Sequence, residues 1–345
     1  MSYSRDEAAE LIIKAGLELV EKGLIARTWG NISARLSDTE FLITPSGMAY
    51  DRLTPEKLVV CKIEDCSYQG EIKPSSEKGV HGEAYKYRPD INFVIHTHQL
   101  YATAVGAMGQ PLYGRTEQEK EILGEGVFSA KYAISSTKPL MRNVSAEIQK
   151  HLKSNGFFMR FHGVLCLGTD YESAFAVSET LEDICQEIIC KKEGLDATAE
   201  TGFVPELPEQ SLREEIKKSS GYTHILFDRS KVVKAMSASG KRVYPMIDDM
   251  AQIAGVSFAC IDPEDKQAVT KIAEAMKKEA CVFVKGLGAV CGAMDESEVE
   301  AVQMVLDKNC LAGVYCGAHG VKDHLGFLDA TMQRRVYVKK YSKLK

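Results

Sequence analysis

Three histidines are the first candidates for chemistry: His96 and His98, two residues apart, and His162, which stands just before the apolar run 163–167. The run 91–98 predicts a strand, and side chains two apart in a strand share a face, so both imidazoles can coordinate one ion. Neutral imidazole suits zinc and neighbouring transition metals, and a catalytic zinc usually takes three protein ligands. From the residues alone, solvated histidines at a strand end and a capping or core histidine at 162 stay open as the alternative.

A carboxylate that could serve acid–base chemistry stands in the segment 73–77, Lys-Pro-Ser-Ser-Glu. The proline fixes a turn, Ser75 and Ser76 expose hydroxyls and backbone N–H groups, and Glu77 falls in the first turn of a helix predicted over 77–87. Helix N-termini attract phosphate because their N–H groups are unpaired and the positive end of the helix dipole lies there. The alternative, that Ser76 only caps the helix and Glu77 is favourably placed beside the dipole, is compatible with phosphate binding.

Two further turns, 29–33 and 44–47, have similar ingredients. Each offers glycine, a small hydroxyl and freed backbone N–H groups, which can form an anion-binding nest, although such turn residues are common in any loop. The other histidines lack a setting for metal binding, with one caution: His81 lies four residues after Glu77 and would share its helix face. The remaining four are His151, His224, His319 and His324.

These residues need a framework, and the hydrophobic pattern predicts one of interleaved helices and strands. Helical spacing is found over 6–22, 139–154 and 171–192, and short apolar runs predict strands over 41–44, 58–63, 91–98 and 163–167. Such interleaving implies a layered α/β or α+β domain. The polar stretch 194–222 contains two prolines and is the predicted linker. Beyond it we expect strands over 224–227 and 281–284 and a helix over 264–279.

The second half of the sequence resembles a degraded copy of part of the first. When 163–166 is placed over 288–291, the register runs on without gaps. The matched pairs include Asp170 with Asp295, Leu181 with Leu306, and Cys185 with Cys310. In this register His162 falls on Leu287, so a repeat would have lost the metal site. The alternative is that two similar strand–helix units match by chance.

Composition narrows the class of protein. At 345 residues the chain is long enough for two domains, and 45% hydrophobic with 26% charged residues is ordinary for a globular protein. The net charge of −5 argues against nucleic acid as a partner. No apolar stretch is long enough for a membrane span, and the charged N-terminus lacks a signal peptide's apolar core, so we expect a cytoplasmic protein. The ten cysteines form no CxxC pair and are predicted to be buried free thiols.

Five segments, in this order and spacing, resemble the class II aldolase/adducin family. They are 30–35, 43–47, 73–77, 94–98 and 162–164, and the resemblance covers about residues 5–192. It implies an α/β fold, a three-layer α/β/α domain around a mainly antiparallel sheet. We therefore predict a catalytic domain over 1–200, followed over 201–345 by a smaller, degenerate repeat of similar type without a metal site.

The resemblance also implies roles for individual residues. One zinc ion per chain, or another divalent transition metal, would be held by His96, His98 and His162. Glu77 becomes the acid/base. The phosphate cradle would consist of Asn31, Ser46, Gly47, Ser75 and Ser76. Aldolases of the family use tyrosine to protonate the departing aldehyde, and among Tyr113, Tyr132, Tyr337 and Tyr341 we take Tyr113 as the candidate.

The residue after the paired serines discriminates within the family, because its 4-epimerases have aspartate there and its aldolases glutamate. Glu77 therefore favours a zinc-dependent class II aldolase that cleaves or forms a C–C bond in a short sugar phosphate through a metal-stabilised enediolate. The alternatives are an epimerase, dehydratase or decarboxylase acting on a related hydroxy-carbonyl compound, and a non-catalytic, adducin-like interaction protein. Family aldolases form rings with sites between subunits, so we expect a homo-oligomer, a dimer or tetramer, in which the second half takes a neighbour's place.

Overall fold

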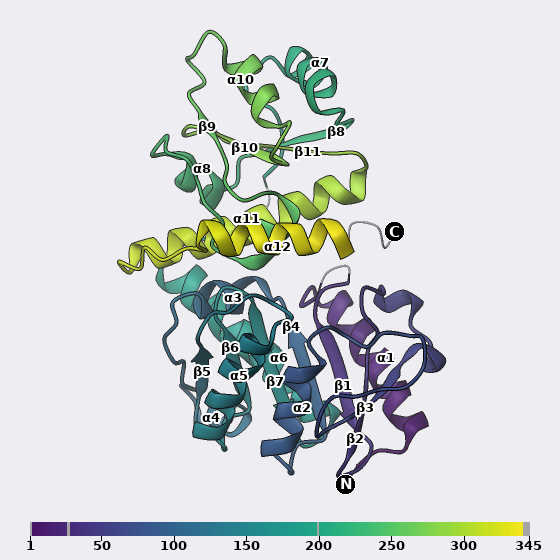
Figure 1. Ribbon diagram of the computed structural model, residues 1–345. Helices are drawn as coiled ribbons and strands as arrows, with labels where there is room; N and C mark the ends of the chain where they lie inside the picture. The colour runs from purple at the N-terminus through teal and green to yellow at the C-terminus, as the bar shows by residue number, and fades with distance from the viewer. Residues whose placement is uncertain (1, 26–27, 199, 341–345) are drawn as a thin grey trace. The chain divides into compact units, whose positions relative to one another are not determined.

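The computed structural model describes residues 2–25, 28–198 and 200–340 of the chain (Figure 1). The chain divides into two compact units, Met1–Glu187 and Ile188–Lys345, and each unit has a sheet of its own. The predicted domain boundary at residue 200 lies a short way beyond this division. All ten cysteines are free thiols, as predicted, but only seven are buried, and Cys66, Cys190 and Cys260 are half-buried. Among the described residues, no helix combines the length and the apolar character needed to cross a membrane.

Unit 1 is built on a seven-stranded sheet with the strand order β3-β2-β1-β4-β7-β6-β5. The strands are β1 (Asn31–Arg35), β2 (Glu40–Ile43), β3 (Val59–Lys62), β4 (Phe93–Thr97), β5 (Val127–Ala130), β6 (Gly156–Met159) and β7 (Gly163–Gly168). All neighbouring pairs are antiparallel except β5 with β6. β4 and β7 are buried along their whole length, which explains their nearly continuous apolar sequence. The predicted, mainly antiparallel sheet is confirmed.

Helices cover both faces of this sheet (Figure 1). They are α1 (Arg5–Glu21), α2 (Lys78–Tyr87), α3 (Leu100–Gly106), α4 (Glu117–Leu123), α5 (Lys138–Lys150) and α6 (Tyr171–Gln186). Unit 1 also has short 3-10 turns at Tyr50–Arg52 and Pro55–Lys57, and a π-helical turn at Glu187–Lys192 begins at its last residue. α1 packs against β1 and β2, and α6 against β4 and β7. α2 and α5 pack together and close an apolar core with the sheet. The predicted three-layer α/β/α arrangement is confirmed.

Local sequence signals explain where the first helix begins and how it packs. The Ser4 hydroxyl accepts a hydrogen bond from the Glu7 backbone N–H at 3.3 Å, which satisfies one of the unpaired donors of the first turn. Ala8, Ile12 and Leu19 follow at helical spacing and are fully buried. Their burial fixes the apolar stripe of α1 against the sheet.

Strand β1 differs from the prediction, which placed its first three residues in the turn 29–33. All five of its residues are buried. Apolar Ile32 and Ala34 alternate with polar Asn31, Ser33 and Arg35. These three polar side chains contact buried partners on α2 instead of water. Prediction from alternation assumes that the polar face of a strand is exposed to water, and that assumption fails for β1. The site is built on these side chains.

The predicted linker is also partly wrong. α7 (Glu209–Ser220) occupies most of the second half of 194–222. The helix buries only Leu212 and Ile216, so its apolar stripe is too thin to stand out from a polar sequence.

Unit 2 contains a four-stranded sheet with the order β8-β11-β10-β9. Its strands are β8 (His224–Asp228), β9 (Cys260–Ile261), β10 (Cys281–Val284) and β11 (Gly288–Ala293). Besides α7, its helices are α8 (Lys231–Ser237), α9 (Asp248–Ile253), α10 (Ala268–Ala275), α11 (Glu296–Ala318) and α12 (Phe327–Lys340). α7 and α10 pack together, and their apolar residues close a core with the sheet.

The two sheets share a pattern of strand pairing. In unit 1, β7 lies between β4 and β6, both antiparallel to it, and β5 is parallel to β6. In unit 2, β11 lies between β8 and β10, both antiparallel to it, and β9 is parallel to β10. The hairpins also agree in register. Gly156 opposes Cys166 and Met159 opposes Gly163 in β6–β7, while Cys281 opposes Cys291 and Val284 opposes Gly288 in β10–β11.

Candidate metal and acid–base site

The three candidate histidines meet where β4 ends and β7 begins. β4 and β7 are antiparallel neighbours, with Thr97 opposite Val164, so the end of one strand adjoins the start of the other. His96 lies near the end of β4, His98 follows the strand, and His162 directly precedes β7. The sheet therefore brings together residues that are far apart in the sequence.

The geometry of the three imidazoles fits a metal ion. One ring nitrogen from each of His96, His98 and His162 lies within 4.8 Å of the others, and His96 Nε2 is 3.1 Å from His98 Nε2. His96 Nδ1 is 2.8 Å from the Val164 carbonyl oxygen. A carbonyl only accepts, so Nδ1 carries a proton and Nε2 is the ring nitrogen left to bind a metal. Within the described ranges, this is the one group of three or more such side chains that could hold a metal.

Two glycines allow the histidines to approach so closely. A Cβ on Gly163 would lie 2.3 Å from the Thr97 carbonyl oxygen and 3.1 Å from His96 Cε1. Gly30 has a φ of +75°, and a Cβ there would lie 2.4 Å from the His96 carbonyl oxygen. Any side chain at either position would push β4 away from its neighbours. The ring of Trp29 stacks on His98 with centroids 6.4 Å apart.

Glu77 faces the histidine group. Its Oε1 lies 3.0 Å from His162 Nε2 and its Oε2 lies 3.1 Å from His96 Nε2. Burial opposes ionisation of this carboxyl, yet the charge and hydrogen bonds of His162 and His96 hold the pKa of Glu77 well below its ordinary value. Glu77 is therefore an ionised, almost completely buried carboxylate aimed at the position where the imidazole nitrogens converge.

Neighbouring groups hold this carboxylate in place. The Ser75 hydroxyl accepts a hydrogen bond from the Glu77 backbone N–H at 3.2 Å. The Ser136 backbone N–H donates to Glu77 Oε1, and the Asn31 side-chain amide donates to Oε2, each at 3.3 Å. Glu77 itself is the residue that precedes α2, and it makes no side-chain capping bond. The alternative role of Ser76 as the helix cap is therefore wrong.

Ser136 was missed by the sequence analysis. It has a φ of +62°, and its hydroxyl lies 2.7 Å from that of Ser76. A signal was available, because Ser135, Ser136 and Thr137 place three hydroxyls before a proline-started helix, much as the turn 73–77 does. A cavity of about 330 Å³ opens beside Glu77. Its lining includes Ser76, Lys78, Ser136 and Lys138.

The residues predicted to cradle phosphate lie on two turns that are joined side by side. The Ser46 N–H donates to the Lys73 carbonyl at 2.9 Å, and the Ser75 N–H donates to the Thr44 carbonyl at 2.9 Å. Gly47 has a φ of +71°, which glycine adopts without strain. Asn31 is opposite His96 in the β1–β4 register. These contacts bring Asn31, Ser46, Gly47, Ser75 and Ser76 to one end of the sheet; phosphate binding by them stays a prediction.

The two candidate tyrosines of unit 1, Tyr113 and Tyr132, lie beside phenylalanine rings. Tyr113 is exposed, its ring lies edge to face with that of Phe128 at 6.0 Å, and a Cβ added to Gly126 would meet it at 2.8 Å. The ring of Tyr132 lies 5.8 Å from that of Phe161, the residue before His162. Tyr337 belongs to α12 of unit 2, and Tyr341 lies outside the described residues. The role of Tyr113 stays a prediction.

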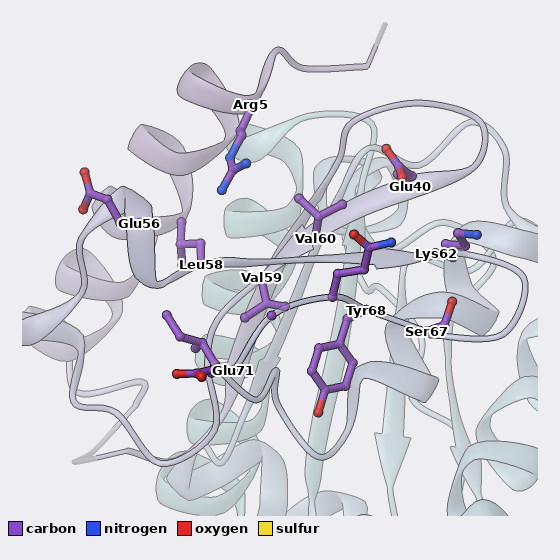
Figure 2. Close-up of a pocket in the computed structure, with 13 residues that line it drawn as sticks. Arg5, Glu40, Glu56, Leu58, Val59, Val60, Lys62, Ser67, Tyr68 and Glu71 are labelled. Atoms are coloured by element: carbon purple, nitrogen blue, oxygen red, sulfur yellow. The ribbon is translucent and has the colours of Figure 1, made fainter.

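A separate pocket of about 620 Å³ runs along β3, an edge strand of the sheet (Figure 2). Figure 2 shows charges of both signs around it, with Arg5 and Lys62 on one hand and Glu40, Glu56 and Glu71 on the other. None of the candidate site residues lines it. Because charges of both signs line this pocket, they favour neither an anionic nor a cationic ligand. The histidine group is therefore the candidate site of unit 1.

Known proteins are similar to this chain over part of its length. The model for the class II aldolase and adducin N-terminal domain matches residues 10–189. An L-fuculose phosphate aldolase of Escherichia coli O6:H1 is 30% identical over 218 residues, which are 63% of this chain and 96% of that protein. A 5-deoxy-D-ribulose 1-phosphate aldolase of Bacillus thuringiensis serovar kurstaki is 30% identical over 214 residues, 62% of this chain and 95% of that protein. A solved L-fuculose 1-phosphate aldolase is similar with a TM-score of 0.49 and 29% identity, over 56% of this chain and 89% of that one. The chain belongs to the class II aldolase and adducin N-terminal domain family.

Proposed function

We propose that this chain is a metal-dependent aldolase that cleaves and forms a C–C bond in a short sugar phosphate. The observation that carries the proposal is the buried Glu77 carboxylate, within 3.1 Å of two imidazole nitrogens of a three-histidine group. A base beside a cation site is what proton removal from carbon next to a carbonyl requires. The names of the aldolase relatives support the same reaction class.

The metal would be held by His96, His98 and His162, one ion per chain, with zinc preferred because all three ligands are imidazoles. When bound, it supplies Lewis-acid stabilisation of the negative charge that develops on substrate oxygens. The backbone hydrogen bond from His96 Nδ1 to Val164 fixes the ring and keeps Nε2 available. Three protein ligands leave room for substrate.

Glu77 would carry the proton. In the synthetic direction it removes a proton from the carbon next to the carbonyl, and in cleavage it returns that proton to carbon. The donors on Ser136 and Asn31 keep its two oxygens aimed while this happens. The turns that hold Ser46 and Ser75 would offer hydroxyl and N–H donors to the substrate phosphate.

In cleavage Tyr113 would accept the proton of the substrate hydroxyl that becomes the aldehyde oxygen, and in synthesis it would return that proton to the aldehyde. Because its side chain is exposed on unit 1, we propose that it acts within a homo-oligomer, a dimer or tetramer, at the site of a neighbouring copy. Measuring the mass of the assembly together with the activity of Tyr113→Phe tests this role. A fully active monomer would contradict it.

Unit 2 is proposed to be a degenerate copy of the second half of unit 1, without a metal site. The matched strand pairings support this: Phe227 opposes Val290 as His96 opposes Leu165. Phe227 and Leu287 then stand where His96 and His162 stand in unit 1. The apolar side chains at these two of the three ligand positions offer a cation no ligand atom.

The reaction is tested with a panel of ketose 1-phosphates, with and without a chelator, by following aldehyde release. We expect at least one compound to be cleaved, and the chelator to abolish cleavage. If metal is bound and no aldehyde is released, the site serves epimerisation, dehydration or decarboxylation. Absence of stoichiometric metal, with no effect of Glu77→Gln on any activity, would favour a non-catalytic, adducin-like interaction protein.

A further inference from the structure

A row of buried polar side chains leads from the interior of unit 1 to Glu77. The Tyr85 hydroxyl lies 2.8 Å from Ser33 Oγ, and Ser33 Oγ lies 2.6 Å from His81 Nδ1. His81 Nε2 lies 2.5 Å from Asn31 Oδ1, and Asn31 Nδ2 lies 3.3 Å from Glu77 Oε2. The row crosses between β1, which supplies Asn31 and Ser33, and α2, which supplies the other two.

We propose that His81 is a positioning residue for the acid/base Glu77, acting through Asn31 and itself oriented by Ser33 and Tyr85. The inference rests on the proposed function of Glu77. It gives roles in the reaction to residues that had none: His81, Ser33 and Tyr85. His81 lies four residues after Glu77, but its ring nitrogens contact Ser33 and Asn31 of β1 and do not join the three metal-ligand histidines.

Glu77, the last residue of the row, sets the direction of every hydrogen bond in it. A carboxylate only accepts hydrogen bonds, so Asn31 must turn its NH₂ toward Glu77 and its carbonyl oxygen toward His81. His81 must then carry its proton on Nε2, which leaves Nδ1 as an acceptor for the Ser33 hydroxyl proton. The Ser33 oxygen is then free to accept from Tyr85. Each donor points toward Glu77.

Burial makes this arrangement rigid. Ser33 and His81 are fully buried, Tyr85 is 1% exposed and Asn31 is 5% exposed, so water cannot replace a lost partner. Burial also lowers the pKa of His81 to about 3, with the nearby His96 as a second cause, so the ring is neutral at ordinary pH and serves as one donor and one acceptor. An unpaired group anywhere in the row would carry its full desolvation cost.

The row orients Glu77 and does not conduct a proton. The amide of Asn31 stands between His81 and the carboxylate, and it passes a hydrogen bond along without exchanging its own proton. The row therefore controls the angle and position of Glu77 Oε2 relative to the substrate carbon. Loss of the row should therefore reduce kcat and leave KM and metal content almost unchanged, because the phosphate donors and the ligands stay in place.

The test isolates the step assigned to Glu77. Cleavage of a ketose 1-phosphate leaves dihydroxyacetone phosphate, so exchange of its carbon-bound proton with D₂O, followed by NMR on the zinc-loaded full chain, reports on Glu77 without the aldehyde. We expect His81→Leu to lower the exchange kcat about 100-fold and Tyr85→Phe about tenfold, with KM nearly unchanged. His81→Gln, which keeps a donor toward Asn31, should recover most of the rate. Tyr87→Phe, on the same helix, is the matched control and should match the wild type.

Two outcomes would overturn the inference while leaving the aldolase proposal intact. One is wild-type exchange in both His81→Leu and Tyr85→Phe with zinc still bound; the other is equal loss in Tyr85→Phe and Tyr87→Phe. A third readout is independent of activity: ¹⁵N NMR of the zinc-loaded protein should show the His81 proton on Nε2. A proton on Nδ1 would overturn the inference even if the enzyme proved inactive, whereas an inactive wild type with the proton on Nε2 would count only against the proposed function.

Discussion

Glu77 Oε1 and His162 Nε2 lie 3.0 Å apart, and both side chains are almost completely buried. Such a pair holds its geometry only when the charges on the two groups are complementary, since an uncompensated buried charge is costly. A cation beside Glu77, whether imidazolium or a bound metal, meets that need. The carboxylate is thereby kept ionised, which is the state required of a base.

The first prediction concerns the base itself. Glu77→Gln should lower kcat for cleavage by about 10²–10⁴-fold, the usual contribution of a positioned acid or base. Zinc content should stay near that of the wild type, because the three histidines are untouched. Steady-state kinetics and metal analysis on the same sample check this. Glu117→Gln, at a fully exposed carboxylate, is the control, and a Glu77→Gln enzyme with undiminished cleavage would remove Glu77 from the mechanism.

The second prediction concerns pH and stability of the metal-free protein. Folding lowers the pKa of His81 from 6.5 to about 3. Below pH 6.5 the unfolded chain therefore takes up a proton that the folded chain refuses, and stability falls as the pH is lowered toward 3. The slope from this one group is about 1 kcal/mol per pH unit. Chemical denaturation from pH 7 to pH 4 should show a shallower fall for His81→Gln than for the wild type.

The exposed His224 supplies the control for this measurement. His224→Gln makes the same change of side chain at an exposed position of β8, so it measures what the substitution itself does to the free energy of unfolding. Identical slopes for wild type and His81→Gln would show that His81 titrates normally in the folded protein.

Much of the site could be predicted because its signals are local. The alternation of β4 placed His96 and His98 on one face, and the polar turn at 73–77 placed Glu77 at the start of α2. The pairing of β4 with β7, which brings His162 to the same point, follows from long-range contacts and could be expected only from the family resemblance.

The polar row beneath the site escaped prediction for a different reason. In the sequence, Ser33 and Tyr85 look like ordinary surface or core residues. Their role depends on their hydrogen-bond partners, which the order of residue types does not reveal. Ser136 is similar: its contact with Glu77 joins a loop to a helix start 59 positions away. Local sequence cannot specify such a pairing.

The third prediction concerns Gly163. Gly163→Ala should weaken zinc binding about tenfold or more, because the new methyl would meet the Thr97 carbonyl at 2.3 Å and the His96 ring at 3.1 Å, and displaced ligands typically lose affinity on that scale. Competition with a chelator measures the affinity. Gly317→Ala, where the structure shows open space around the added carbon, should bind zinc like the wild type. If Gly163→Ala also binds normally, the close approach of β4 and β7 does not constrain the ligands.

The fourth prediction concerns metal stoichiometry. The full chain should bind one zinc ion, since His96, His98 and His162 form the one such group among the residues that the structure describes. His98→Ala should reduce the bound metal well below one per chain, and it should abolish the rise in melting temperature that zinc gives the wild type, because a ligand stabilises only the state that binds it. Elemental analysis and thermal denaturation with added zinc check both points, with His224→Ala as the control. Two ions per chain would place metal outside this group and would contradict the proposal that unit 2 carries no site. A His98→Ala protein that still holds one ion as tightly as the wild type would remove His98 from the set of ligands.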